Sequence, residues 1–139
     1  MEITANALQT VGINDNVLFT DTAVRGNCSI IHREGSGLTT LKGITNQCRA
    51  RYRVTFGANV GLPTGAATEP IELAIAVNGE AVLTTTMIST PVAVEEFNNV
   101  FTSIFLDIPA NCCYQLSVKN IGITEVDVQN ANLIVERVA

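Results

Sequence analysis

The stretch Cys48-Arg-Ala-Arg-Tyr-Arg-Val-Thr-Phe-Gly-Ala-Asn-Val60 decides the fold of this chain. Its even-numbered positions are all apolar or aromatic, whereas its odd-numbered positions carry arginine, threonine, glycine and asparagine. Side chains that alternate with a period of two point to opposite faces of a β-strand. We therefore predict that Tyr52, Val54 and Phe56 lie in the core. At about 3.3 Å per residue, the strand is long enough to cross a whole β-sandwich.

The composition indicates one domain with an aliphatic core and a surface that carries few charges. The 139 residues match the size of a single domain, so we expect residues 1–139 to form one unit in which residues 1–9 are a candidate N-terminal arm. Hydrophobic residues make up 47% of the chain, aromatic residues 5% and charged residues 15%. Charged residues usually make up about a quarter. This low content of charged residues suggests that identical subunits cover part of the protein surface in an oligomer.

Charge and hydropathy argue against several classes of protein. The net charge of −5 disfavours a nucleic-acid-binding protein, which needs a basic face. No apolar run approaches the length of a membrane span, so no membrane insertion is expected. The N-terminus shows no basic segment followed by an apolar one, so no signal peptide is predicted. We expect synthesis in the cytoplasm and arrival at any exterior location by assembly or lysis.

A β-hairpin is predicted around the Asn-Gly pair at 78–79. The preceding residues 71–77 alternate like a strand, and Asn-Gly is the preferred two-residue hairpin turn because both positions need a positive φ. The return strand is predicted over residues 80–87, in a register that places Ala74 opposite Leu83. This face should be half-exposed, yet it is built of small apolar residues. The candidate interface residues of the hairpin are Ala74, Ala76 and Leu83.

A second segment, residues 99–108, is apolar on both faces. Val100 and Ile104 belong to one face, and Phe101 and Phe105 belong to the other. A strand with one solvent-exposed face usually carries polar residues on that face. Either both faces are buried within the subunit, or one of them packs against a partner. Phe101 and Phe105 therefore join the candidate interface.

The remaining segments complete an all-β pattern. Turn signals every 8 to 15 residues separate about eight to ten predicted strands, and no segment shows a convincing helical period. The last strand, residues 126–138, changes phase near Gln129-Asn130, where a β-bulge is expected. We predict an all-β sandwich or barrel without significant helix.

The residues that could carry chemistry form no catalytic set. His32, the single histidine, follows Cys28 by four positions, which on a strand is about 13 Å and too far for proton transfer. Loop carboxylates such as Asp15, Asp21 and Glu34 can bind calcium, but no dense Asp-x-Asp spacing is present. We predict no catalytic residue, no cofactor and no metal.

The four cysteines are predicted to be reduced thiols. They form no C-x-x-C pair, and the chain has a single histidine that could serve as a further zinc ligand. A structural zinc site is therefore not expected. Two of them fall on apolar faces, Cys48 and Cys112, and should behave as small core hydrophobes. A cytoplasmic product favours the reduced state. The sequence does not itself determine the redox state of Cys28, Cys48, Cys112 and Cys113.

Arg49, Arg51 and Arg53 form the only concentrated positive charge in this acidic chain. One interpretation is a solvated strand face with acidic partners on neighbouring strands. Another is an ionic contact with an acidic neighbour, either another subunit or a capsid shell. A glycan that bears sulfate or phosphate is a third. Three basic residues do not make a nucleic-acid groove.

The order of these segments resembles the tumour-necrosis-factor/C1q-like (TNF/C1q-like) jelly roll. In that family the long strand usually reads Gly-x-Tyr-x-Val-x-Phe, and residues 50–56 match except that alanine replaces glycine. Gly-Ser-Gly at 35–37 and the strand that ends at Asn-Gly 78–79 match as well, and residues 132–138 resemble the closing strand. The resemblance spans roughly residues 10–139. It is strongest to bacterial and phage versions: the heads of collagen-like spore-surface proteins, and small virion decoration or fibre-head proteins.

The resemblance implies an antiparallel jelly-roll β-sandwich that forms a homotrimer around an axis lined by apolar and aromatic side chains. No Gly-x-y collagen run precedes the domain, which favours a stand-alone phage structural protein. The first hypothesis is thus a non-enzymatic virion component, a capsid decoration or head-fibre-like protein that contacts capsid proteins or host-surface glycans. The second is the carbohydrate- or receptor-binding trimeric head of a bacterial or spore surface protein. An enzyme on this scaffold, such as a cupin, would need clustered metal-binding histidines.

Overall fold

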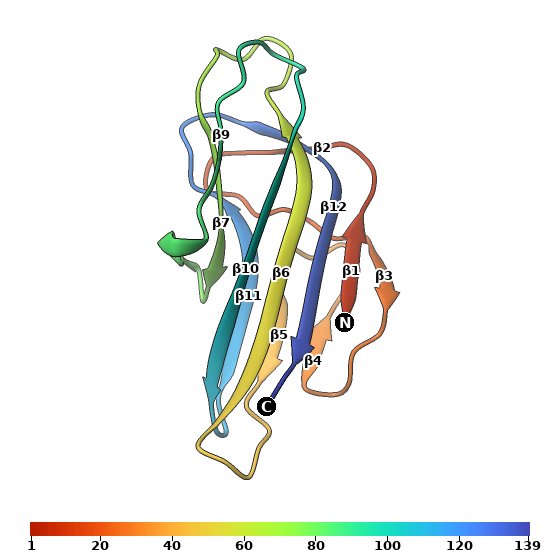
Figure 1. The fold of residues 1–139 in the computed structure, drawn as a ribbon. Coiled ribbons are helices and arrows are strands. Elements are labelled where there is room, and N and C mark those ends of the chain that lie inside the picture. The colour runs from red at the N-terminus through yellow and green to blue at the C-terminus, as the bar shows by residue number, and fades with distance from the viewer.

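The computed structural model describes residues 1–139, which fold into two antiparallel β-sheets packed as a sandwich (Figure 1). Sheet A contains β1 (Glu2–Ala5), β2 (Gln9–Val11), β3 (Asp21–Val24), β6 (Arg49–Gly61), β10 (Asn98–Pro109) and β12 (Val126–Arg137). Sheet B contains β4 (Ile30–His32), β5 (Thr39–Lys42), β7 (Ile71–Val77), β8 (Glu80–Ala81), β9 (Met87–Ser89) and β11 (Cys113–Asn120). One turn of 3-10 helix, η1 (Leu83–Thr85), joins β8 to β9, and no helix is long and apolar enough to span a membrane.

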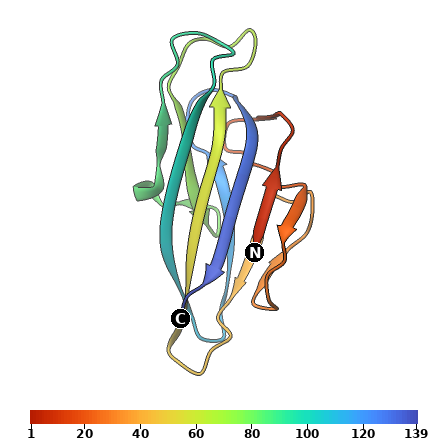
Figure 2. The same cartoon turned by 45° about the vertical axis from the view of Figure 1, so that its right-hand side comes forward.

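The strands follow a jelly-roll order. Sheet A runs β10-β6-β12-β1-β3, with β2 paired to β12, and sheet B runs β4-β5-β11-β7-β8, with β9 paired to β7. The chain crosses from sheet A to sheet B after β6, returns for β10, and crosses again for β11 and β12. In Figure 2, β10, β6, β12 and β1 lie side by side in the front layer. This Greek-key connectivity confirms the predicted jelly-roll sandwich.

The structure has twelve strands where about eight to ten were predicted. The predicted return strand 80–87 is interrupted, because β8 ends at Ala81 and η1 separates it from β9. Ala76 does pair with Ala81, but Leu83 does not lie opposite Ala74. Residues 21–27 contain no alternating pattern and predict a loop, but residues 21–24 form the short edge strand β3.

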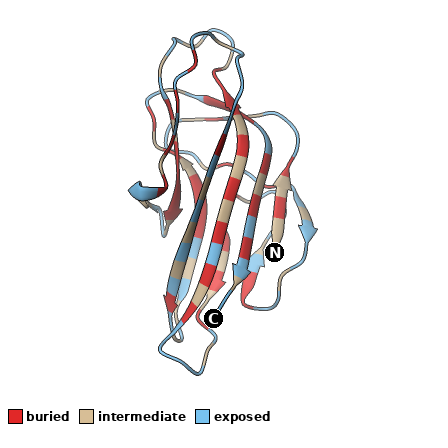
Figure 3. Ribbon diagram, in the orientation of Figure 1, coloured by how far each residue is buried: buried red, intermediate tan, exposed pale blue.

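β6 is the central strand, as its alternation predicted. It pairs with β10 along its length and with β12 on its other side, and buried positions alternate along it in Figure 3. Tyr52, Val54 and Phe56 are each 0% exposed, which confirms the predicted core. The Tyr52 hydroxyl donates a hydrogen bond to the carbonyl oxygen of Lys42 at 2.6 Å, so this buried polar group is satisfied.

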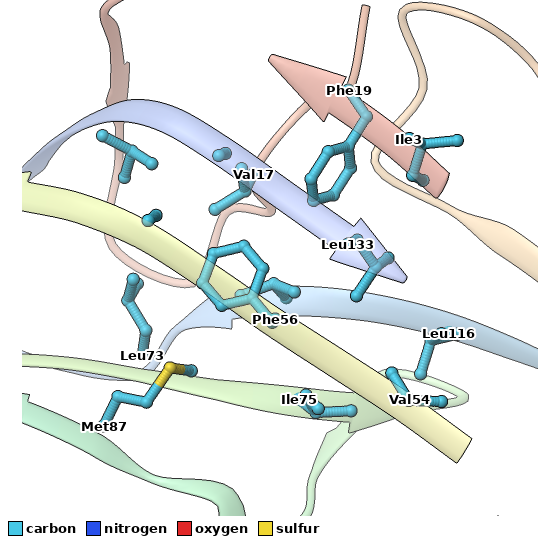
Figure 4. Close-up of a cluster of buried hydrophobic side chains, with 14 of the residues drawn as sticks. Ile3, Val17, Phe19, Val54, Phe56, Leu73, Ile75, Met87, Leu116 and Leu133 are labelled. Atoms are coloured by element: carbon cyan, nitrogen blue, oxygen red, sulfur yellow. The ribbon is translucent and has the colours of Figure 1, made fainter. Parts of the chain in front are cut away.

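The core between the sheets is mainly aliphatic, with one aromatic pair at its centre. The rings of Phe19 and Phe56 meet edge to face, with centroids 6.3 Å apart and an interplanar angle of 84°. Figure 4 shows Val54 of sheet A beside Ile75 and Leu116 of sheet B. The side chains of both sheets thus interdigitate, as a sandwich of this kind requires.

The N-terminal residues are part of the sandwich, so the prediction of an arm at residues 1–9 is wrong. β1 lies between β12 and β3 in sheet A, and Ile3 is 0% exposed. The amide of Val135 donates to the carbonyl oxygen of Met1 at 2.8 Å. The segment Ile3-Thr4-Ala5 itself predicts the first part of a split strand, and β1 confirms this strand.

The predicted bulge in the last strand is present. The register of β12 against β6 shifts between Gln129 and Asn132, and Asn130 has a φ of 55°. Both Gln129 and Asn130 are exposed. A bulge of this kind adds residues to one strand and re-aims its side chains.

Candidate functional site

Two exposed phenylalanines lie on the outer face of sheet A. Phe101 is 65% exposed and Phe105 is 59% exposed, and both belong to the edge strand β10. Ile134 of β12, 38% exposed, is the third large apolar side chain on the outer face of β10, β6 and β12. Leu83 of η1 is 73% exposed, and η1 lies next to β10. Three of the five predicted interface residues, Leu83, Phe101 and Phe105, are thus accessible along one edge of the sandwich.

The prediction that Ala74 and Ala76 form an interface is wrong. Both are 0% exposed in the single chain and are therefore unavailable to a neighbour. Lys119 of β11 lies opposite Ala74, and its Nζ donates to the carbonyl oxygen of Gly79 at 3.2 Å. The aliphatic stem of this lysine runs along the outer side of the hairpin and helps to cover the small alanines.

Arg49, Arg51 and Arg53 pair with acids of their own chain. Asp107 accepts hydrogen bonds from Nε and Nη2 of Arg51 at 2.8 and 3.1 Å, and lies 3.0 Å from Nε of Arg49. Nε of Arg53 lies 3.2 Å from Glu136. Asp107 is opposite Arg51 in β10, and Glu136 is opposite Arg53 in β12. The interpretation of acidic cross-strand partners matches the structure, and the alternative of ionic docking to another molecule loses its support.

The Arg51 hydrogen bond lowers the pKa of Asp107 below its ordinary value of 3.8. An aspartate with a lowered pKa in the folded state stabilises the fold above its unfolded-state pKa and loses this contribution as the pH falls through the folded-state pKa. We expect Asp107→Asn to reduce the free energy of unfolding slightly at neutral pH, with no difference from the wild type in strong acid. Urea unfolding across this pH range measures the effect.

The control for this prediction is Glu80→Gln, which removes an exposed acid that has no arginine partner. The two variants have the same net charge. A loss at neutral pH that persists undiminished below pH 3.8 would contradict the ion-pair explanation for Asp107.

A row of asparagines crosses one end of sheet A. Nδ2 of Asn99 lies 3.3 Å from Oδ1 of Asn59, Nδ2 of Asn59 lies 3.1 Å from Oδ1 of Asn130, and Nδ2 of Asn130 lies 2.6 Å from Oδ1 of Asn6. The row links β10, β6, β12 and the segment after β1. Sequence reasoning missed it, because only the bulge in β12 brings Asn130 into line with Asn59.

The largest hollow is a groove of about 780 Å³ at the other end of the sandwich. It lies between the loop after β5, the turn between β10 and β11, and Arg137 near the end of β12, at the lower end of the molecule in Figure 1. Nη1 of Arg137 donates to the carbonyl oxygen of Ile44 at 2.5 Å. The amide of Gly43 donates to Cys112 at 2.8 Å, and that of Asn111 donates back to Gly43 at 3.0 Å. We call this hollow the basal groove.

The four cysteines are free. Cys112 packs partly against the core, as predicted. Cys48 is exposed, so its assignment to the core is wrong. The reason is that β6 begins at Arg49, and the pleat that buries Ala50 does not extend to Cys48.

The single histidine, His32, contacts other residues of its own sheet and loops. Nε2 of His32 donates to the carbonyl oxygen of Ser36 at 3.0 Å, and its ring meets the edge of Phe19 with centroids 6.4 Å apart. Cys28 is exposed. Across residues 1–139, no three histidine, cysteine, aspartate or glutamate side chains are grouped so that they could hold a metal ion.

No family model matches the chain, and no curated protein matches it either. Among solved structures, the chain is similar to the native structure of a family 35 carbohydrate binding module from Clostridium thermocellum. The sequences are 14% identical, the match covers 96% of this chain and 98% of the other, and the TM-score is 0.38. At this TM-score the likeness carries no argument about function.

Proposed function

We propose that the protein is a non-enzymatic structural protein whose chains assemble as a homotrimer along the edge formed by β10 and η1. The observation that carries this proposal is the exposure of Phe101 and Phe105, 65% and 59%, in the outer face of one sheet. Removing a phenylalanine side chain from water stabilises a complex by about 1.5–3 kcal/mol. A row of exposed apolar side chains usually marks a contact surface, and Leu83 extends the row along the same edge.

In the proposed trimer, the edge of one chain contacts the sheet face of the next. Such a contact joins two different surfaces, and repeated contacts of this type close into a ring when the rotation permits. β10 is twelve residues long and has a free edge, which natural proteins usually cover or blunt. A trimer is the ring that the TNF/C1q-like resemblance implies. Three copies of Phe101 and Phe105 would then line its axis.

We further propose that the trimer is a virion component, either a capsid decoration or a head-fibre-like protein. Charged residues make up only 15% of the chain, and the arginines of β6 are paired within the chain. A surface with few free charges suits packing against other proteins. Mass spectrometry of purified particles from the genome that encodes the protein tests this role; particles that lack the chain would contradict it.

Light scattering of the purified chain tests the assembly. The expected mass is that of three chains of 14.8 kDa, and it should stay constant as the protein is diluted. A mass of one chain at every concentration would contradict the trimer. Because the measurement needs no ligand, it decides the oligomeric state independently of any binding activity.

The second candidate function is a carbohydrate- or receptor-binding head of a bacterial or spore surface protein. The observation that favours it is the basal groove, which is open to solvent and most of whose lining residues are polar. A glycan array tests it, with retention of acidic or neutral glycans as the expected result. No retention at high protein concentration would count against it.

A further inference from the structure

We propose that the basal groove binds an anionic oligosaccharide, a sugar chain that carries carboxylate or sulfate groups. The inference rests on the second candidate function and names its ligand class. It does not depend on the trimer, because the residues that line the groove do not include Leu83, Phe101 or Phe105.

Two cations line the basal groove and no acidic side chain does. Lys42 and Arg137 are both partly buried. Neither takes part in an ion pair with an acidic side chain, since the three pairs of the chain involve Arg49, Arg51 and Arg53. Taking a cation partly out of water is unfavourable unless an anion compensates it. In a protein of net charge −5, two such cations in one groove indicate a site for an anion.

The guanidinium group of Arg137 is held in place by the chain, and both cations keep donors free. Nε of Arg137 donates to the carbonyl oxygen of Ala139 at 3.1 Å and Nη1 donates to Ile44 at 2.5 Å, so Nη2 remains for a ligand. The backbone of Lys42 is fixed by the hydroxyl of Tyr52 and by pairing with Cys113 of β11. The ammonium group of Lys42 has no acceptor in the chain. Guanidinium and ammonium groups form charge-assisted hydrogen bonds to carboxylate and sulfate oxygens.

Three carboxamides complete the lining, Asn46, Gln47 and Asn111. None of their side chains is hydrogen-bonded within the chain. A carboxamide offers both a donor and an acceptor, which matches the hydroxyl groups of a sugar. The groove volume of about 780 Å³ falls within the range of small-molecule sites, about 300–1,000 Å³, and far exceeds a single inorganic anion. The carboxamides can bind the hydroxyl groups of a sugar, and the two cations can bind its acidic groups. The lining therefore favours a sugar that carries acidic groups as the ligand.

The basal groove is preformed in the chain without a ligand. A Cβ atom on residue 43 would lie 2.1 Å from the carbonyl oxygen of Pro109, so only glycine allows the two loops to approach this closely. The reciprocal backbone hydrogen bonds of Gly43 with Cys112 and Asn111 lock the loops together. A preformed site avoids the entropy cost of ordering loops on binding.

Isothermal titration calorimetry of the full chain tests the inference with four probes: a heparin-derived tetrasaccharide, a tetragalacturonate, cellotetraose and inorganic sulfate. We expect binding of one or both anionic tetrasaccharides, weakened by added salt, and no binding of cellotetraose. The comparison of the first two probes decides between sulfate and carboxylate. Lys42→Met should weaken binding at least about tenfold, because it removes a charge-assisted hydrogen bond and keeps the stem. Asn46→Ala should weaken it without a change of charge.

The matched control is Arg33→Gln, which removes one exposed positive charge outside the groove. Equal weakening by Lys42→Met and Arg33→Gln would overturn the inference, as would binding of neither anionic probe. Binding of inorganic sulfate as tight as that of a tetrasaccharide would overturn the assignment to an oligosaccharide. Light scattering of the same samples reports the oligomeric state. An absence of oligosaccharide binding is therefore distinguished from an absence of trimer assembly. Unchanged thermal unfolding of each variant shows that the fold is intact.

Discussion

Replacing both Phe101 and Phe105 with aspartate is expected to convert the proposed trimer into monomers. Light scattering should then give the mass of a single 14.8 kDa chain. Both side chains are more than half exposed in the chain, so their replacement removes no core packing. In the trimer, however, two aspartates per chain would bring like charges together near the axis and would forfeit about 1.5–3 kcal/mol for each phenylalanine.

The control for this pair is Ile31→Asp, which changes an exposed apolar residue of β4 in sheet B. It should leave the mass unchanged. A trimer that survives the double substitution would show that the β10 edge is not the interface. Far-ultraviolet circular dichroism of the double variant should remain that of a β-sandwich, so that a change in mass is not mistaken for unfolding.

Phe56→Ala is expected to lower the free energy of unfolding by about 3–5 kcal/mol. Phe56 is 0% exposed at the centre of the longest strand and packs edge to face against Phe19. Alanine leaves a cavity between the sheets, because β6 is held on both sides by β10 and β12 and cannot move inward. Denaturant unfolding should show a lower midpoint with an unchanged slope.

The graded comparison for this site is Phe56→Leu, which keeps most of the side-chain volume and should cost less than Phe56→Ala. If Phe56→Ala changed stability by less than about 0.5 kcal/mol, as surface substitutions usually do, the residue would not be in the core. A change of slope would instead point to an altered unfolded state.

The fold could be predicted where long strands leave a period in the sequence. β6 has thirteen residues, enough for six or seven alternations, and its predicted core face is buried from Ala50 to Val60. The bulge near Gln129-Asn130 was also predictable, since the apolar phase changes there. The short edge strand β3 was not predictable, because four residues give too few alternations. Its pairing with β1, rather than its own sequence, makes it a strand.

The surfaces were predicted less well, because exposure depends on what lies beside a residue. Ala74 and Ala76 were predicted on a half-exposed face, but both are 0% exposed in the folded chain. The arginines of β6 look like unpaired charge until Asp107 and Glu136 are placed beside them by strands that come some 56 and 83 residues later in the chain. Long-range pairing of this kind leaves no local signal.

The sequence by itself determined the all-β class, the central strand and its buried face, because side-chain alternation is a local property of the chain. Only the tertiary structure decided which charges are paired, which apolar residues stay exposed, and where a groove forms. The basal groove joins the loop after β5, the turn before β11 and Arg137, segments that become neighbours only when the Greek-key connections bring them to the same end of the sandwich. Residues 48–60 set up this architecture, whereas its surfaces are products of how the other strands pack around them.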